Sequence, residues 1–261
     1  MTPSLISKHI LPLMAALAAS GMAAAPSRAR DQPGLRACYG IVTFGREAPD
    51  IRLMQVVTKG QRVPFYQNRT EKTPHCPVEV DSCQLKSFVV PGDLLLAGPD
   101  MDDFACATFI SPKARRVKGP FREIIGFVPL SEMKVMDPAP PGPAAWSGTW
   151  YRSSGAEIHI EQDGAGQLKL RGQATYGALD QDRLKRGAVN LGGLEGTVRM
   201  PKANMIALGE GYDGVTPLDD DRSRCRARLR LFGPYLVVED NGGCGGNSVS
   251  FIGIYMRLKQ H

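Results

Sequence analysis

Short runs in which apolar and polar residues alternate follow one another along the chain. Residues 156–162 read AEIHIEQ, with two isoleucines separated by polar side chains, and residues 167–170, QLKL, alternate in the same way. Successive side chains of a strand point to opposite faces of its sheet, so this alternation predicts strands with one buried face. The Asp-Gly pair at 163–164 between the two runs is typical of a hairpin turn. Long runs of helical periodicity are few, and the chain is therefore expected to be mainly β.

Further strands are predicted in the first half of the chain, at VTKGQRVPFYQN (57–68), SFVVPGDLLLAG (87–98), FACATFI (104–110) and IIGFVPLSEM (124–133). The second of these contains Pro-Gly-Asp. Proline fixes its own φ and glycine accepts the positive φ of a tight turn. We therefore expect a strand, a turn and another strand in that run.

A proline-rich stretch divides the chain into two parts. Residues 137–146, DPAPPGPAAW, contain four prolines, a composition typical of an extended, semi-rigid spacer. Four cysteines precede this stretch and two follow it. We predict a first β domain over 26–136, a linker over 137–145 and a second, antiparallel β domain over 146–261, built as a barrel or a sandwich.

The first 25 residues have the order of a secretory signal peptide. Lys8 precedes an apolar stretch at 10–19, and small residues follow up to Ala25. The apolar stretch is shorter than the roughly 20 residues of a spanning helix. The sequence predicts an exported soluble protein, periplasmic or secreted, of a Gram-negative bacterium, with no integral membrane segment after cleavage.

Six cysteines lie beyond the predicted signal peptide, and an even number in an exported chain predicts disulfides. The expected pairs are Cys225–Cys244 by position, Cys76–Cys83 by their short loop, and Cys38–Cys106 as the remaining two. No C-x-x-C pair is present and histidines are few. We therefore expect neither a metal site nor a cofactor.

The succession of VPFY, PGD and GFVPLSEM over about residues 38–133 resembles the bacterial SH3-like domains of exported proteins. The resemblance implies a small β-barrel that binds cell-wall peptide or glycan, or holds a neighbouring domain in place. Phe65, Tyr66 and Phe127 would then form the wall of an aromatic groove, or else belong to the core. Those domains usually end in Gly-Trp, whereas Gly126 is followed by Phe127 here.

The second domain opens on Gly148, Thr149 and Trp150, which is similar to the first strand of calycin-type barrels such as lipocalins and avidins. Its length of about 115 residues suits eight short strands. No tryptophan follows Trp150, so a biotin pocket of the avidin type is not expected. We expect Trp146 and Trp150 to plug one end of a barrel.

The segment SRCRARLRLFGPYLVVEDNGGCGG (223–246) predicts a second hairpin. A turn centred on Gly233 and Pro234 would place Arg228 opposite Glu239, leucines opposite aliphatic residues, and Cys225 close to Cys244. Such a disulfide closes a loop of about 20 residues and contributes about 3 kcal/mol. The glycines around Cys244 then serve tight chain reversals, an interpretation favoured over a phosphate loop because the sequence that follows is strand-like. The run from Asp240 to Arg257 resembles the ending of uncharacterised exported proteobacterial proteins.

Four arginines at alternating positions of this hairpin form the most conspicuous candidate surface. Strand geometry places Arg224, Arg226, Arg228 and Arg230 on the face opposite the leucines. Guanidinium groups bind carboxylate and phosphate, which an exported protein meets on the cell wall. The alternative is an ordinary solvated face.

The net charge of +6 is spread along the chain and is not typical of a nucleic-acid-binding protein. No G-x-S-x-G motif is present, and His159 is expected to point outward from its strand. The sequence is therefore consistent with three functions: a non-enzymatic binding or adaptor protein of the cell envelope that binds a peptidoglycan component or a protein partner, an inhibitor or immunity protein against a cell-wall hydrolase, and a cell-wall hydrolase.

Overall fold

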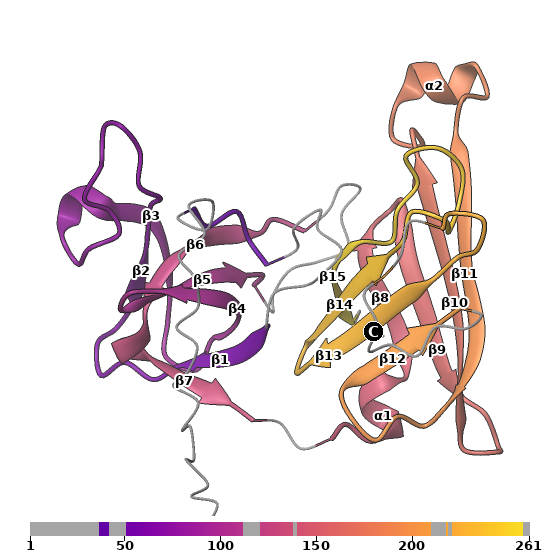
Figure 1. Cartoon of the computed structure of the whole chain (residues 1–261), viewed down its shortest axis with the longest axis horizontal. Coiled ribbons are helices and arrows are strands. Elements are labelled where there is room, and N and C mark those ends of the chain that lie inside the picture. Colours follow the sequence, from indigo (N-terminus) through magenta and orange to yellow (C-terminus); the bar gives the residue numbers. More distant parts are fainter. Residues whose placement is uncertain are drawn as a thin grey trace, which may run out of the picture. The chain divides into compact units, whose positions relative to one another are not determined.

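The computed structural model describes residues 37–41, 51–111, 121–137, 140–209, 218 and 221–257. Within these ranges the protein is mainly β, as the sequence predicts, with two antiparallel sheets and two short α-helices (Figure 1). The predicted signal peptide lies outside the described residues. None of the helices in the described ranges is long and apolar enough to cross a membrane.

The first sheet has seven strands in the order β3-β2-β6-β5-β4-β1-β7. Two single 3-10 turns, Asp81–Cys83 and Leu130–Glu132, precede β3 and β7. The strands are β1 (Arg52–Val56), β2 (Val63–Tyr66), β3 (Gln84–Val89), β4 (Leu94–Met101), β5 (Phe104–Phe109), β6 (Ile124–Pro129) and β7 (Met133–Met136).

The predicted Pro-Gly-Asp turn joins β3 to β4. Gly92 has a φ of +90°, and the N–H of Asp93 donates to the carbonyl of Val90 at 3.0 Å. The two strands do not pair with each other, because β3 pairs with β2 while β4 lies between β1 and β5. The turn therefore moves the chain from one edge of the sheet to its other half.

The second sheet has eight strands in the order β11-β10-β9-β8-β15-β14-β13-β12. Each strand pairs with its neighbour in sequence, except that β8 pairs with β15 and β11 has no ladder with β12. The strands are β8 (Gly148–Ser153), β9 (Ala156–Gln162), β10 (Gln167–Tyr176), β11 (Asn190–Arg199), β12 (Met205–Leu208), β13 (Ala227–Phe232), β14 (Tyr235–Asp240) and β15 (Gly253–Arg257). This is an up-and-down sheet that nearly closes into a barrel.

Side chains from all eight strands fill the interior of this second sheet. Trp146, at the end of the short helix α1 (Pro143–Trp146), and Trp150 are fully buried there, as the sequence predicts. The indole N–H of Trp150 donates to the carbonyl of Trp146 at 2.8 Å. The guanidinium of Arg257 lies over the Trp150 ring and donates to the last carbonyls of α1. Residues 143–145, expected in the extended linker, thus form a helical turn against the barrel core.

The hairpin of β13 and β14 has the register predicted from its sequence. Phe232 pairs with Tyr235, and Arg228 pairs with Glu239. The leucines of β13 belong to the barrel core. β14 is buried along its whole length, so its outward side chains are covered as well as its inward ones.

The outward side chains of β14 pack against the first sheet. Tyr235 and Val237 share one apolar cluster with Leu53 and Leu96. The hydroxyl of Tyr235 lies 2.7 Å from the carbonyl of Leu94 and 3.2 Å from that of Ile110. Burial raises the pKa of this phenol further above neutrality, so the hydroxyl stays protonated and donates over a wider pH range.

Candidate functional site

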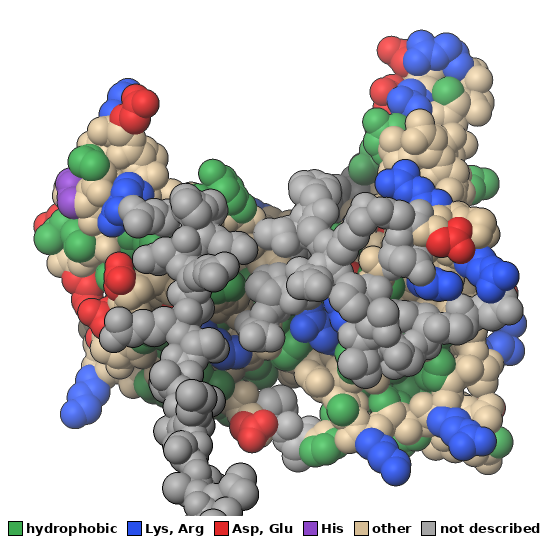
Figure 2. Space-filling model, viewed as in Figure 1, with side chains coloured by type: hydrophobic (Ala, Val, Ile, Leu, Met, Phe, Trp, Pro, Cys, Tyr) green, Lys and Arg blue, Asp and Glu red, His purple; other side chains and the backbone are tan. Residues whose placement is uncertain are grey.

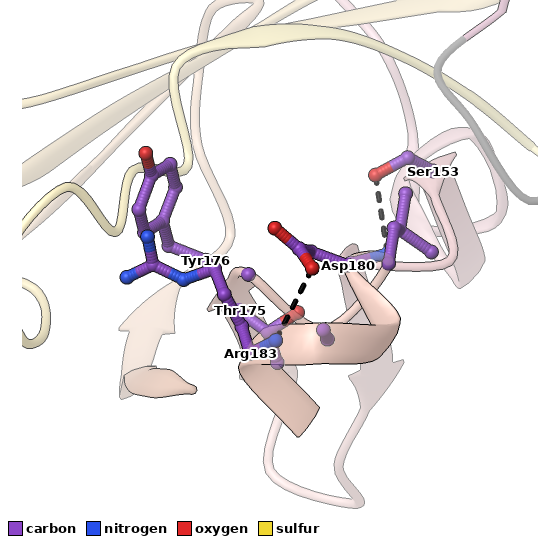
Figure 3. Close-up of a pocket in the computed structure, with 9 residues that line it drawn as sticks. Ser153, Thr175, Tyr176, Asp180 and Arg183 are labelled. Carbon is purple, nitrogen blue, oxygen red and sulfur yellow. Dashed lines mark hydrogen bonds between the residues drawn. The ribbon is translucent and has the colours of Figure 1, made fainter. Parts of the chain in front are cut away.

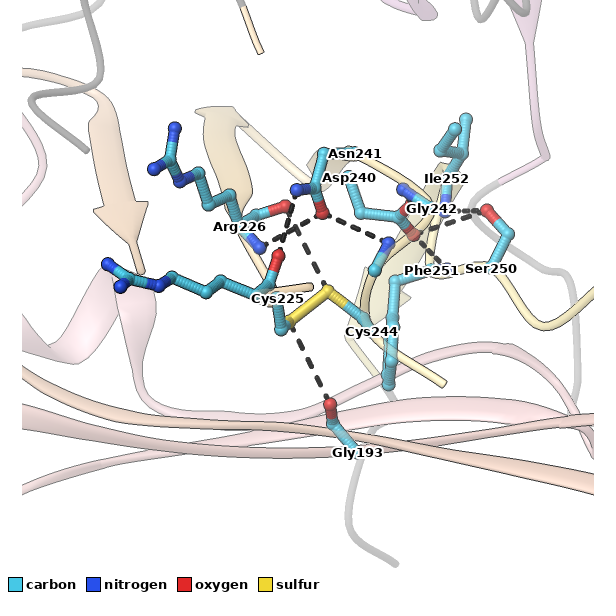
Figure 4. The surroundings of a disulfide bond; sticks show 12 residues. Gly193, Cys225, Arg226, Asp240, Asn241, Gly242, Cys244, Ser250, Phe251 and Ile252 are labelled. Carbon is cyan, nitrogen blue, oxygen red and sulfur yellow. Dashed lines mark hydrogen bonds between the residues drawn. A yellow bond between two sulfur atoms is a disulfide. The ribbon is translucent and has the colours of Figure 1, made fainter. Parts of the chain in front are cut away.

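The structure contains the three disulfides expected from the sequence: Cys38–Cys106, Cys76–Cys83 and Cys225–Cys244. Disulfides persist in oxidising surroundings, so this set indicates an extracytoplasmic environment. Cys225–Cys244 ties the start of β13 to the loop that follows β14 (Figure 4). We call residues 240–252 the closure segment.

A buried carboxylate organises the closure segment. Asp240 accepts hydrogen bonds from the backbone N–H of Gly242 at 2.7 Å and of Phe251 at 2.6 Å, and from the hydroxyl of Ser250 at 3.2 Å (Figure 4). Asn241 accepts from the N–H of Arg226 and donates to nearby carbonyls. Polar groups that resembled ligand-binding elements in the sequence are therefore used within the fold.

The glycines of the closure segment allow it to lie directly against β11. The N–H of Gly193 donates to the carbonyl of Cys244, and the N–H of Gly246 donates to that of Leu191, each at 3.0 Å. Gly192 and Gly245 form a β-bridge, and a Cβ at Gly192 would lie 2.4 Å from the carbonyl oxygen of Cys244. The segment thus closes part of the gap left beside β11, which supports the scaffold interpretation.

The predicted arginine stripe is only partly exposed. The side chains of Arg228 and Arg230 keep 12% and 15% of their surface exposed. Arg228 donates to Glu239 at 2.9 Å, and Arg230 lies 3.8 Å from the same carboxylate. Both lie on the face opposite the leucines and Arg228 is opposite Glu239, as predicted, but the covered outer face of β14 leaves these two arginines little exposed as a binding surface. Arg224 is exposed and Arg226 is half-buried, and their binding role stays a prediction.

The three aromatic residues that the sequence assigned either to a groove wall or to the core belong to the core. Phe65, Tyr66 and Phe127 are all buried. Tyr66 packs edge-on against Phe104 in a cluster that contains the first two disulfides. Phe65 lies among the aliphatic residues of the first sheet. A groove wall requires exposed ring faces, so the groove interpretation of these residues is wrong.

Two candidates for chemistry are accounted for by their surroundings. His75 lies near Cys76 and Cys83, but both sulfurs are in a disulfide and provide no thiolate for a metal. His159 is exposed on β9, as expected, with one ring nitrogen 3.2 Å from the hydroxyl of Thr149 and the other 3.7 Å from Glu161.

The segment between β10 and β11 exposes apolar side chains that the sequence did not single out. It contains the short helix α2 (Gln181–Lys185), which lies at the far end of this strand pair in Figure 1. Four large apolar residues at the strand ends and in the segment are 43–69% exposed: Tyr176, Leu179, Leu184 and Leu191. The segment also carries Arg183, Lys185 and Arg186. We call residues 176–191 the α2 tip.

Both ends of α2 are capped, so the tip has a defined conformation. Asp180 accepts from the N–H groups of Asp182 and Arg183 at 2.9 and 3.1 Å. At the other end, Gly187 has a positive φ and donates to the carbonyl of Leu184, and Ala188 donates to that of Arg183. These two bonds are those of a Schellman motif. The Asp180 and Gly187 pair was the signal in the sequence that could have revealed the helix.

A pocket of about 330 Å³ lies at the base of the α2 tip. Figure 3 shows the ring of Tyr176 and the guanidinium of Arg183 stacked together on one side of it, Ser153 on the other side, and the carboxylate of Asp180 between them. The guanidinium lies 4.7 Å from the ring centroid of Tyr176. A basic, an acidic and an aromatic group thus converge on one concave site.

Charged side chains elsewhere are dispersed. On the face drawn in Figure 2, Lys and Arg side chains of the described residues lie among acidic and neutral ones.

Comparison of the chain with protein-family models, curated proteins and solved structures finds no match. The SH3-like and calycin-like resemblances therefore stay predictions.

Proposed function

We propose that this protein is a non-catalytic binding protein of the periplasm of a Gram-negative bacterium, and that it binds peptidoglycan through the α2 tip. The observation that carries the proposal is the exposure of four large apolar side chains beside three basic ones on a capped, projecting segment. Contiguous exposed apolar surface with a polar rim is typical of interaction sites.

The chemistry of the tip fits the polymer. Peptide stems of the wall carry carboxylates, which Arg183, Lys185 and Arg186 would attract, and sugar rings present apolar C–H faces that pack on Tyr and Leu side chains. The half-buried Arg226 and the exposed Arg224 add positive charge in the same domain. The mild positive charge of the whole chain favours association with an anionic polymer.

Co-sedimentation of the oxidised protein with purified peptidoglycan sacculi, titrated with salt, tests the proposal. We expect saturable binding that weakens as salt rises, because screening reduces the attraction between exposed charges. Replacing Leu179, Leu184 and Leu191 together with Ser should lower the bound fraction at least tenfold.

The matched control replaces exposed apolar residues of the first sheet, Val57 and Val135, with Ser. This variant should bind as the unaltered protein does. Loss of binding in the control but not in the tip variant would contradict the assignment of binding to the α2 tip. Absence of sedimentation at low salt would overturn wall binding and favour a protein partner, including a cell-wall hydrolase that the protein inhibits.

A further inference from the structure

The pocket at the base of the α2 tip has the size and composition of a site for one small ligand. Its volume of about 330 Å³ is at the lower end of the range of about 300–1,000 Å³ for ligand pockets. Residues at the ends of β8 and β10 and at the start of α2 line it. A ring-sized molecule fits such a volume better than a polymer segment does.

Arg183 is held in one orientation inside this pocket. Its Nε donates to the carbonyl of Ala188 at 3.1 Å, and its guanidinium stacks on the Tyr176 ring. Gly177 has a φ of +86°, and a Cβ there would lie 2.5 Å from the Nε of Arg183, so a glycine is needed for this placement. The two terminal nitrogens of Arg183 have no hydrogen-bond partner within the described ranges. They form a preorganised donor pair for a carboxylate.

Two hydroxyl groups line the opposite part of the pocket. The Oγ of Ser153 accepts from the N–H of Gly155 at 3.2 Å, which leaves its own hydroxyl hydrogen for a ligand. The Oγ1 of Thr175 is buried and has no hydrogen-bond partner among the residues that the structure describes. A buried hydroxyl without a partner is unfavourable, and a ligand oxygen at this place would satisfy it.

An acceptor and an apolar wall complete the site. One oxygen of Asp180 caps α2, which leaves the second carboxylate oxygen to accept from a hydroxyl or amide of a ligand. Tyr176 and Leu179 keep 43% and 52% of their surface exposed beside it. The site therefore offers a fixed cation, hydroxyl donors, an anionic acceptor and an apolar face.

We infer that this pocket binds a single sugar residue that carries a carboxylate, with the carboxylate on Arg183, ring hydroxyls on Ser153, Thr175 and Asp180, and one sugar face beside Tyr176. The inference rests on the proposed function, because it names the ligand class of the same end of the molecule. N-acetylmuramic acid without its stem peptide, whose lactyl carboxylate is then free, and free uronic acids share this chemistry.

Isothermal titration of the full oxidised protein with three sugars tests the inference. N-acetylmuramic acid and N-acetylglucosamine differ by the lactyl carboxylate, and glucuronic acid carries a carboxylate on a different ring. We expect saturable binding of the first, with affinity at least tenfold weaker for N-acetylglucosamine. Binding of glucuronic acid as tight as that of N-acetylmuramic acid would assign the site to acidic sugars in general, and weaker binding would assign it to muramic acid with a free lactyl carboxylate.

Two variants and one control locate the site. Arg183→Gln and Gly177→Ala should each weaken binding of the acidic sugar at least tenfold, the second by displacing the guanidinium. Both should leave the weak affinity for N-acetylglucosamine within a factor of two. Arg199→Gln removes an exposed arginine of β11 outside the pocket and should change neither affinity.

The outcomes separate this inference from the proposed function. Equal affinity for the acidic and neutral sugars, or no saturable binding of any of the three, overturns the sugar-acid site while sacculi binding through the leucines of the tip can still be observed. Binding of N-acetylmuramic acid with no sedimentation on sacculi overturns wall binding and supports the pocket.

Discussion

The closure segment and the α2 tip both adjoin strand β11. The polar groups of the closure segment are hydrogen-bonded within the fold, whereas the tip exposes apolar side chains and hydrogen-bond donors. In the closure segment, Asp240 and Asn241 accept hydrogen bonds from backbone N–H groups of the protein. In the tip, Leu184 and Leu191 face solvent, and the terminal nitrogens of Arg183 have no partner within the described ranges. The internal hydrogen bonds of the closure segment support a scaffold role, whereas the exposed apolar side chains and donors of the tip support the proposal of a binding site.

The two segments also differ in how far their amino-acid composition departs from that of an ordinary loop. The closure segment contains four glycines and a cysteine, an unusual composition that allows its backbone to lie close to β11. The sequence of the tip contains no motif or alternation that distinguishes it from an ordinary connection between two strands. An unusual composition therefore indicates that the residues of a segment are constrained. Only the structure shows whether the fold or a binding role imposes the constraint.

The largest effect on stability is expected from Asp240→Ala. Three donors lose a charged acceptor, and hydrogen bonds to charged groups contribute about 1.5–3 kcal/mol each, although not additively. We expect a loss of about 3–4 kcal/mol in the free energy of unfolding, measured by urea denaturation. A loss below about 1 kcal/mol would contradict the structural role of this carboxylate.

Replacing Cys225 and Cys244 together with Ser should cost about 3 kcal/mol, because the unfolded chain regains the entropy of a loop of about 20 residues. Urea denaturation of the oxidised proteins measures this loss in the free energy of unfolding. Titration with N-acetylmuramic acid provides the second readout. A variant that unfolds more easily but retains the affinity of the sugar would show that the disulfide acts on the barrel alone.

Adjacent glycines of β11 offer a matched pair. Gly192→Ala would bring a methyl group against the carbonyl of Cys244, and overpacking of this kind costs about 1–3 kcal/mol. A Cβ at Gly193 meets no atom within 4 Å. Thermal denaturation should therefore show a lower Tm for Gly192→Ala and little change for Gly193→Ala. Equal effects would mean that the closure segment does not lie against β11.

A smaller effect is expected from Asp180→Ala, which removes the cap of α2. Loss of an N-cap costs about 1 kcal/mol. Because the same carboxylate lines the pocket, affinity for the acidic sugar should fall as well. A calorimetric titration measures the affinity of this variant for the sugar, and a denaturation curve on the same sample measures its stability. The loss of stability should be far smaller than that of Asp240→Ala.

The smallest effect on stability is expected from Leu191→Ser in the tip. Exposed positions away from special contacts change the free energy of unfolding by about 0.5 kcal/mol or less. Sacculi binding should nevertheless fall, because Leu191 is the most exposed of the four apolar residues of the tip. A loss of stability above about 1 kcal/mol would place this side chain in the core.

Much of the fold could be predicted because it depends on local rules. The hairpin of β9 and β10, the register that opposes Arg228 to Glu239, and the burial of Trp146 follow from the alternation of apolar and polar residues. The first hairpin has a loop over 163–166 with the positive φ at Gly166, not at Gly164 of the predicted Asp-Gly turn. The expected exposure of Arg228 failed because it depends on what covers β14. The apolar run in YLVVED was the available signal, since strands buried on both faces are apolar throughout.

The candidate site could not be predicted for a related reason. Leucines between two strands are ordinary in a sequence, and only the arrangement of β10, α2 and β11 leaves Leu179 and Leu191 uncovered. The pocket joins Ser153 to Arg183, which belong to different hairpins. Residues that converge through tertiary structure leave no spacing pattern in the chain.

The pairing of β8 with β15 sets the order in which translation and folding can occur. These strands join the two ends of the barrel sequence, and Arg257 donates to the carbonyl of Ala144, 113 residues earlier. A ribosome must therefore complete β15 before the barrel can close, and contacts so distant in sequence form slowly. Until β15 is available, β8 and β14 each have one edge without its partner strand.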